Sequence, residues 1–314
     1  MSIAIISHPH CELHDAGENH PEQPARVKVI QTALEAYSFS VPVSFLMAPL
    51  ATRVDLLRVH DVDYLDWLFS IAPEKENIRI DEDTVMNSHT MEAALRAAGA
   101  VLLAVDQVMT GAAQVAFCNI RPPGHHAEPK QAMGFCFFNN VAIGVEYAKA
   151  TYGLKRIAII DFDVHHGNGT QAIFQKDTEV LLCSSFEHPL YPGYDMEMDN
   201  EHILAVPLPA GISGEAFRTA VESAWFAKLA AFQPELIFFS AGFDAHRDDP
   251  LANLSLTKHD YVWLTSHIAT IARRYCQGRI VSVLEGGYHL PALAECVPAH
   301  VEAMVSHISS GVSR

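Results

Sequence analysis

The fold is decided by the stretch RIAIIDFDVHHGNGT at residues 156–170, which joins an apolar run to a dense group of polar side chains. The run from Arg156 to Ile160 has the length and branched residues of a buried strand, and Gly167-Asn168-Gly169 ends the pattern before a helix that starts at Thr170. Between them lie side chains that bind metals or transfer protons: Asp161, Asp163, His165 and His166. Catalytic groups of open α/β sheets lie at the carboxyl ends of strands, so we predict that a site begins here.

Composition limits the class of protein. The chain has 314 residues, 49% hydrophobic and 18% charged, which is enough to bury a large core, and we predict one domain over residues 1–314. A formal charge of −16 disfavours binding to phosphates, so the sequence predicts neither nucleic acid nor membrane as a partner and suits a cationic substrate. Eighteen histidines, several in pairs or beside carboxylates, favour metal or proton chemistry.

Cysteine usage and hydropathy indicate the compartment. The six cysteines form no C-x-x-C pair and are typical of free thiols in a reducing environment. The N-terminus lacks the basic and apolar segments of a signal peptide. The longest apolar tract, Ala93 to Met109, contains Arg96 and Asp106 and therefore predicts a buried helix rather than a membrane span. We expect a soluble, cytoplasmic protein.

Strand and helix patterns alternate along most of the chain. A strand at residues 3–7 precedes a polar, histidine-rich loop from His8 to Pro24, whose length is typical of the rim of a site. Further strands are predicted at residues 114–118, 156–160, 180–184, 236–241 and 279–284. Helices are predicted at residues 25–37, 56–69, 91–109, 139–152, 170–175, 214–231, 257–273 and 290–309. This alternation predicts a parallel sheet covered by helices.

Four segments that follow predicted strands end in unusual polar residues. They are RPPGHH (121–126), DFDVHH (161–166), SAGFDAH (240–246) and EGGY (285–288). Parallel strands bring their carboxyl ends to one edge of the sheet, so we expect these segments to form one cluster. It holds more ionisable groups than can be buried without a metal or mutual pairing.

The spacing within two of these segments predicts a metal site. Asp163 and His165 are two residues apart, so at an extended strand end they project to the same face, and Asp244 from another strand completes three ligands. Two carboxylates, an imidazole and an open position suit a catalytic zinc, which acidifies a bound water. A solvated Asp–His salt bridge explains one such pair but not four coincident strand ends.

The remaining polar groups suit acid–base chemistry. His125 and His126 follow a stiff Pro-Pro-Gly turn, and one of the imidazoles can act as general base and then as general acid. Asp161 can orient a histidine by accepting its other ring N–H. Tyr288, after two glycines, can reach an oxyanion that forms opposite the metal. Ordinary loop histidines and a packing tyrosine are the alternative interpretation.

These motifs, in this order, resemble those of the zinc-dependent histone deacetylase family, and more closely its class II branch with the bacterial histone-deacetylase-like and acetylpolyamine amidohydrolases. The resemblance runs from HPEQPAR at residues 20–26 to EGGY at 285–288 and covers most of the chain. It implies an arginase/deacetylase-like three-layer α/β fold with a central, mostly parallel eight-stranded sheet. Asn168 agrees with the asparagine that class II members carry at this position.

The resemblance also implies a role for each matching residue. The implied zinc ligands are Asp163, His165 and Asp244, and the implied catalytic residues are His126 as general base and acid, His125 paired with Asp161, and Tyr288 against the substrate carbonyl. The implied walls of the acyl-lysine tunnel are Gly134 and Phe135, with Tyr191 opposite. A structural potassium ion is implied beside the zinc, held by Asp161 and Ser185 with the backbone carbonyls of Asp163, His165 and Phe186.

The implied reaction is hydrolysis of an N-acetyl amide, and its substrate depends on the residue that follows Asp248-Asp249-Pro250. Polyamine-selective relatives carry an acidic residue there, whereas this chain has Leu251, which favours an acyl-lysine in a peptide or protein. An acetylpolyamine is the alternative, because acidic residues that suit it occur elsewhere: Asp81, Glu82, Asp83, Asp195, Glu197 and Asp199.

Other interpretations have less support. The segment DAHRD at residues 244–248 resembles a motif of binuclear manganese ureohydrolases, but their further Asp-x-Asp and Gly-Gly-Asp-His segments are missing. A non-catalytic acyl-lysine binder is disfavoured by the complete catalytic set. The first loop carries a second set of metal-competent residues, for which a polar rim is the favoured explanation: His8, His10, Cys11 and His14. Ordinary surface or supporting roles are predicted for His246, His259 and His289, and homo-oligomerisation is left open.

Overall fold

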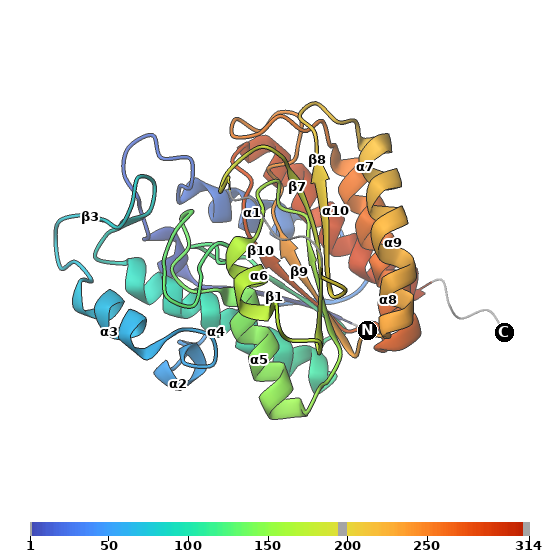
Figure 1. Cartoon of the computed structure of the whole chain (residues 1–314), viewed down its shortest axis with the longest axis horizontal. Helices are drawn as coiled ribbons and strands as arrows, with labels where there is room; N and C mark the ends of the chain where they lie inside the picture. Colours follow the sequence, from blue (N-terminus) through green and yellow to red (C-terminus); the bar gives the residue numbers. More distant parts are fainter. Residues whose placement is uncertain (1, 194–199, 310–314) are drawn as a thin grey trace.

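A parallel sheet organises the molecule, which we describe from a computed structural model covering residues 2–193 and 200–309 (Figure 1). Within these residues the sheet has eight strands, all paired in parallel. Their order is β2 (Val43–Met47), β1 (Ile3–Ser7), β5 (Val115–Cys118), β10 (Ile280–Leu284), β9 (Leu236–Ala241), β6 (Ile157–Asp161), β7 (Val180–Glu187) and β8 (Ile203–Leu208). The predicted parallel α/β sheet is confirmed.

The strand order explains why the polar segments meet. The four segments singled out above follow β5, β10, β9 and β6, which are four consecutive strands of the sheet. Every residue of these strands is buried, because helices cover both faces. The register places Asp161 at the end of β6 beside Ser240 of β9 and Ser184 of β7. The carboxyl ends therefore finish at one level and present their loops together.

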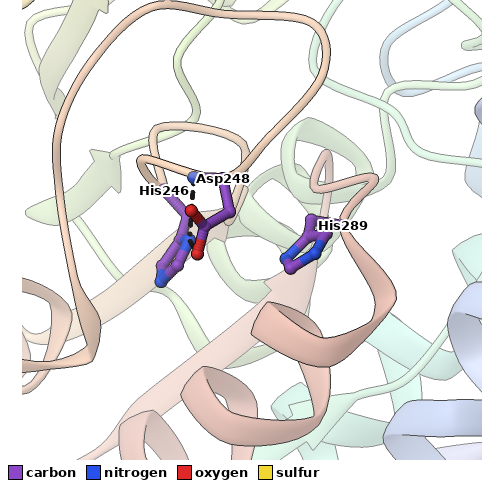
Figure 2. Close-up of side chains that lie close together, drawn as sticks. All are labelled: His246, Asp248 and His289. Carbon is purple, nitrogen blue, oxygen red and sulfur yellow. Dashed lines mark hydrogen bonds and ion pairs between the residues drawn. The ribbon is translucent and has the colours of Figure 1, made fainter.

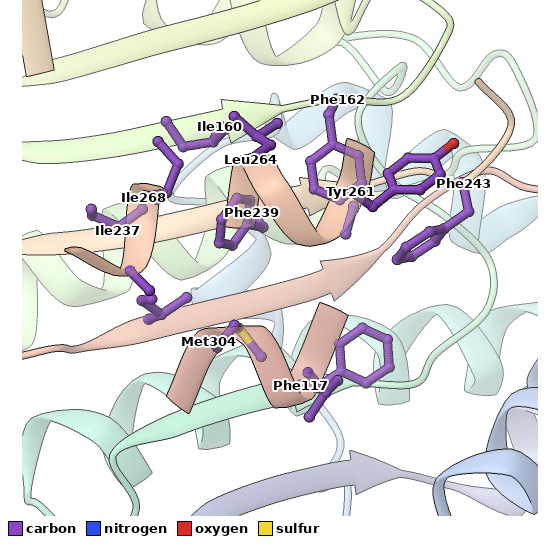
Figure 3. Close-up of a cluster of buried hydrophobic side chains, with 14 of the residues drawn as sticks. Phe117, Ile160, Phe162, Ile237, Phe239, Phe243, Tyr261, Leu264, Ile268 and Met304 are labelled. Atoms are coloured by element: carbon purple, nitrogen blue, oxygen red, sulfur yellow. The ribbon is translucent and has the colours of Figure 1, made fainter. Parts of the chain in front are cut away.

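One face of the sheet is covered by the N-terminal helix and the C-terminal helices (Figure 1). These are α1 (Ala25–Ala36), α7 (Gly214–Val221), the π-helical η2 (Glu222–Phe226), α8 (Ala227–Phe232), α9 (Lys258–Tyr275) and α10 (Leu290–Ser309). Figure 3 shows Phe239 of β9 among the side chains of this layer, including Leu264 of α9 and Met304 of α10. This apolar layer fixes the positions of β9 and β10, whose ends carry half of the polar segments.

The opposite face packs against α4 (Thr90–Met109), α5 (Asn140–Tyr152) and α6 (Asn168–Phe174). The helices approach closely because small residues face one another: a Cβ on Gly144 of α5 would lie 2.4 Å from Val101 Cγ1 of α4. A smaller cluster lies under α2 (Arg53–Leu56) and α3 (Val62–Ser70). The remaining elements are the 3₁₀ helix η1 (Pro9–Glu12) and the strand pair β3 (Ile78–Arg79) and β4 (Val85–Met86).

The structure differs from the local predictions in one helix and four strands. The helix predicted at residues 56–69 starts only at Val62, because α2 ends at Leu56 and the Asp61 side chain accepts the Asp63 N–H to begin α3. The strand pair β3 and β4 was not predicted, and neither were two strands of the main sheet, β2 and β8. Both lie at sheet edges, where β2 is largely exposed and β8 contains Pro207, so neither has the continuous apolar pattern of the central strands. Among the described residues, no helix is long and apolar enough to cross a membrane.

Candidate active site

Two carboxylates and an imidazole converge at the ends of β6 and β9. His165 Nδ1 lies 3.1 Å from Asp163 Oδ1 and 3.2 Å from Asp244 Oδ2. All three residues are buried. The structure thus brings together the three predicted zinc ligands, with one ligand atom from each lying within 4.8 Å of the others.

The surroundings of these side chains fit a divalent cation. Asp244 Oδ2 is buried and accepts no hydrogen bond from any described residue. The other oxygens are occupied, since Gly286 N donates to Asp163 Oδ2 at 2.8 Å and Val164 N to Asp244 Oδ1 at 2.9 Å. A buried carboxylate oxygen without a donor is costly unless a cation neutralises it, and this donor set suits Zn²⁺.

Glycines shape the space around the ligands. A Cβ on Gly286 would lie 2.0 Å from Asp244 Oδ2, and one on Gly242 would lie 2.0 Å from Asp163 Oδ2. Gly287 has φ +113°, which side chains rarely adopt. In the sequence, Gly286 and Gly287 before Tyr288 indicate flexibility that lets the tyrosine reach the substrate. At Gly286 the structure supplies a different physical reason, which is the close approach of the backbone to the carboxylates, whereas a Cβ on Gly287 would lie 2.9 Å from Leu293 Cδ2.

The paired histidines are in opposite electrostatic environments. Burial alone lowers the pKa of His125, but Asp163 and Asp161 outweigh it and raise that pKa to about 10. His125 Nδ1 lies 3.1 Å from Asp161 Oδ2, as the predicted pairing requires. For His126, burial and then the neighbouring His125 and His165 hold the pKa well below its usual value. A pair of groups whose pKa values are driven apart is a typical acid–base arrangement.

A hydrogen-bond chain defines which nitrogen of His126 carries the proton. Asn168 Nδ2 donates to Glu128 Oε1 at 2.8 Å, which turns Asn168 Oδ1 toward His126 Nδ1, 2.8 Å away. An amide oxygen only accepts, so Nδ1 of neutral His126 carries the hydrogen and Nε2 keeps its lone pair. The ring lines the cavity described below, which leaves this lone pair available as a base.

Tyr288 is positioned by its backbone and its ring. Its N–H donates to Asp249 Oδ2 at 2.7 Å, and the Arg26 guanidinium lies 5.0 Å from the ring centroid. Burial, followed by the charge of Asp244, raises the pKa of the phenol well above its usual value. Tyr288 therefore keeps its O–H, which can donate a hydrogen bond to a substrate oxygen.

A cavity of about 480 Å³ leads to these residues. It is lined by His126, His165 and Tyr288, by the predicted tunnel residues Gly134, Phe135 and Tyr191, and by Leu251, on which the predicted substrate depends. The Phe135 ring meets Tyr288 edge-on at 6.0 Å between centroids, and the Tyr191 ring meets His126 in the same way at 5.0 Å. A Cβ on Gly134 would lie 2.5 Å from His126 Cδ2, so only glycine lets the wall approach the base.

A buried ionic network behind the site was not predicted. Glu22 accepts hydrogen bonds from Arg26 Nη1 at 2.9 Å and from Arg121 Nη2 at 2.6 Å, and all three side chains are fully buried. Arg26 also donates to the carbonyls of Gly287 and Glu285, both at 2.5 Å. In the sequence, Glu22 and Arg26 belong to the HPEQPAR segment at residues 20–26. That segment carries part of the family resemblance, but its local pattern does not show that its charges pair with Arg121.

The first loop does not assemble the alternative metal set. His14 Nδ1 bonds to Thr90 Oγ1 at 2.8 Å, whereas His10 Nε2 lies 3.2 Å from Glu92. The described residues of this loop contain no group of three ligands close enough for an ion. Residues 16 and 18–21 instead line the cavity, as a rim does.

Two further predictions remain untested. Asp161 Oδ1 accepts the Asp163 N–H at 3.1 Å and Ser185 is buried, but potassium binding stays a prediction. Of the acidic residues considered for a polyamine, Glu82 and Asp83 line the cavity. Three others lie outside the described residues: Asp195, Glu197 and Asp199.

The site places three potential metal ligands beside acid–base side chains, and comparison with known proteins identifies the family. Residues 20–304 match the histone deacetylase domain, so the chain belongs to the histone deacetylase family. The crystal structure of the HDA15 HD domain superposes with a TM-score of 0.88 at 30% identity, covering 97% of this chain and 88% of that one. The predicted arginase/deacetylase-like fold is confirmed.

Relatives come from plants, bacteria and slime moulds. The chain is 39% identical to the chloroplastic histone deacetylase 14 of Arabidopsis thaliana, covering 93% of this chain and 74% of the relative. It is 36% identical to the histone deacetylase-like amidohydrolase of Pseudomonas aeruginosa, covering 92% and 78%. The chain spans only 21% of type-2 histone deacetylase 2 of Dictyostelium discoideum, at 35% identity over 97% of its own length.

Proposed function

We propose that this chain is a zinc-dependent deacylase that hydrolyses short acyl groups, acetyl above all, from Nε-acyl-lysine in peptides or proteins. Asp163, His165 and Asp244 would hold the metal, and the observation that carries the proposal is their convergence beside the cavity, which His165 lines. Zinc in such a site supplies Lewis acidity toward a carbonyl and a water molecule.

His126 acts as the general base and then as the general acid. Its neutral ring presents Nε2 to the cavity because Asn168 accepts the Nδ1 proton. Once it has taken a proton from the attacking water, His126 can return it to the leaving amine nitrogen. His125, held cationic by Asp161 and Asp163, stabilises the negative charge that develops nearby.

Tyr288 donates its phenolic hydrogen to the acyl oxygen. Negative charge grows on this oxygen as the carbonyl becomes tetrahedral, and a fixed donor stabilises that charge more than it stabilises the ground state. Asp249 and Arg26 hold the tyrosine in place from its backbone and from its ring face.

The shape and charge of the cavity bear on the substrate. Apolar Phe135, Tyr191 and Leu251 line its walls and suit the methylene chain of an acyl-lysine. The rim carries Glu18 and Asp83, which suit a positively charged partner. An acetylpolyamine is the second candidate for this reason, although Leu251 offers no carboxylate to its distal ammonium group.

The test compares kcat/KM for an acetyl-lysine peptide and for N-acetylputrescine, using the zinc-loaded full chain. We expect the peptide to be preferred, and a preference for N-acetylputrescine would transfer the proposal to polyamines. His126→Ala should lose most hydrolysis of both substrates, since general acid–base catalysis contributes about 10²–10⁴-fold. It should keep the fold and one zinc per chain. Turnover close to wild type would refute the assigned base, and absence of hydrolysis in the wild-type chain would refute the function.

A further inference from the structure

A second group of metal-competent side chains lies outside the candidate active site. Figure 2 shows His246, Asp248 and His289 facing one another from two loops. The first two lie on the turn that follows β9, and His289 immediately precedes α10. One ligand atom from each residue lies within 4.8 Å of the others. The sequence predicts only ordinary surface or supporting roles for both histidines, because they are 43 residues apart and no local spacing pairs them.

The separations are close to those that one ion requires. Two ligand atoms at about 2.1 Å from a tetrahedral zinc are about 3.4 Å apart. His246 Nδ1 lies 3.6 Å from Asp248 Oδ2, so this pair is almost in place. The His289 ring centroid lies 6.3 Å from that of His246, so the half-buried His289 side chain would rotate to complete the ligand set. Two imidazoles with one carboxylate suit zinc, cobalt or nickel better than calcium or magnesium.

The backbone holds the two loops together. Arg247 N donates to Leu256 O at 2.9 Å, and Asp249 N donates to His246 O at 2.9 Å, which pins the turn. The Asp249 carboxylate then accepts the N–H of His289 at 3.3 Å and so ties the turn to the start of α10. Because hydrogen bonds hold the backbone of both loops in place, the backbone needs little reorganisation when an ion binds.

The nitrogen atoms available to an ion are also evident. His289 Nδ1 is buried and has no hydrogen-bond partner among the described residues. His246 Nδ1 accepts the Asp248 N–H at 3.2 Å, so this nitrogen carries no hydrogen, and an ion bound to its lone pair would displace that hydrogen bond. The Arg247 guanidinium lies 3.9 Å from Asp248 Oδ2 and opposes a cation, while the Asp248 side chain is 51% exposed. The ion should therefore bind more weakly here than at Asp163, His165 and Asp244.

We propose that His246, Asp248 and His289 form a second binding site for a divalent metal of the zinc type. The two groups of ligands share no residue, so this is a separate site and not half of a bridged binuclear centre. An ion bound there would join the turn after β9 to the loop that carries Tyr288. The inference does not depend on the proposed deacylase activity.

Titration of the metal-free full chain with Co²⁺ tests this proposal. Visible absorption and the metal content after desalting report how many ions bind, and at which affinity. We expect two Co²⁺ per wild-type chain. Asp248→Asn should weaken the second ion at least about 10-fold, because it removes a direct ligand. Since Asp248 is half exposed, this variant should fold, and His246→Asn provides a second test.

Two controls separate the sites. His165→Asn should remove the ion from the candidate active site and retain the one at His246, whereas His259→Ala, an exposed histidine on α9, should keep both. The proposal is overturned if the wild-type chain binds a single Co²⁺ that His165→Asn abolishes. It is also overturned if Asp248→Asn and His246→Asn bind the second ion with unchanged affinity. Failure of the first ion to bind would instead contradict the zinc site of the proposed function.

Discussion

Replacing Glu22 by glutamine removes one negative charge from the buried network and leaves its volume almost unchanged. Glu22 is fully buried and accepts hydrogen bonds from Arg26 and Arg121, which are buried as well. Loss of one partner from a buried ion pair costs about 3–5 kcal/mol, because the remaining charge is left uncompensated. The perturbation therefore tests whether this network stabilises the fold behind the site.

The remaining hydrogen bonds place the expected loss at the lower end of that range. Arg121 Nη1 still donates to the carbonyls of Cys11 and His14, each at 2.8 Å. Arg26 still donates to the carbonyls of Gly287 and Glu285. We therefore expect Glu22→Gln to lower the free energy of unfolding by about 3 kcal/mol, or the melting temperature by roughly 4–5 °C for a chain of this size.

Unfolding in urea is the suitable assay, because urea is uncharged and does not screen the ion pairs. Asp66→Asn is the matched control: Asp66 bonds to Arg53 at 2.6 Å, but its side chain is 64% exposed. An exposed pair contributes about 1 kcal/mol or less, so the control should stay close to wild type. A Glu22→Gln chain whose stability falls by no more than that of the control would refute the reasoning.

Three further outcomes follow from the structure. Gly286→Ala should lower the zinc content of the purified chain, because its Cβ would lie 2.0 Å from Asp244 Oδ2; a full equivalent of tightly bound zinc would contradict this. Leu251→Glu should shift the kcat/KM ratio about 10-fold toward N-acetylputrescine, because an attraction of about 1.4 kcal/mol between the introduced carboxylate and the ammonium group of the substrate corresponds to a tenfold change. An unchanged ratio would show that position 251 does not select the substrate. The third outcome concerns pH. Burial alone raises the pKa of the Glu22 carboxyl, but Arg121, His14 and Arg26 hold it well below its ordinary value of 4.5. Its stabilisation is therefore complete above pH 4.5 and lost as the pH falls through the depressed pKa, so melting temperatures of wild type and Glu22→Gln should converge in acid.

Much of the fold and of the metal site follows from local sequence patterns. Buried central strands such as β6 and β9 are apolar along their whole length, which distinguishes them from the helices between them. The spacing of Asp163 and His165 places both on one face of a strand end. These features depend on neighbours in the chain, so the sequence alone predicts them. The edge strands β2 and β8 lack such a pattern and were missed.

Other features depend on the order of strands in the sheet, which local patterns do not encode. Glu22 and Arg121 are 99 residues apart, and they pair only because their segments meet behind one sheet edge. The hydrogen on His126 Nδ1 is decided by Asn168, and the orientation of Asn168 is decided by Glu128. His246 and His289 meet because β9 and β10 are adjacent. The sequence by itself determined which residues end the strands, and the tertiary structure decided which of them meet, because long-range contacts depend on strand order.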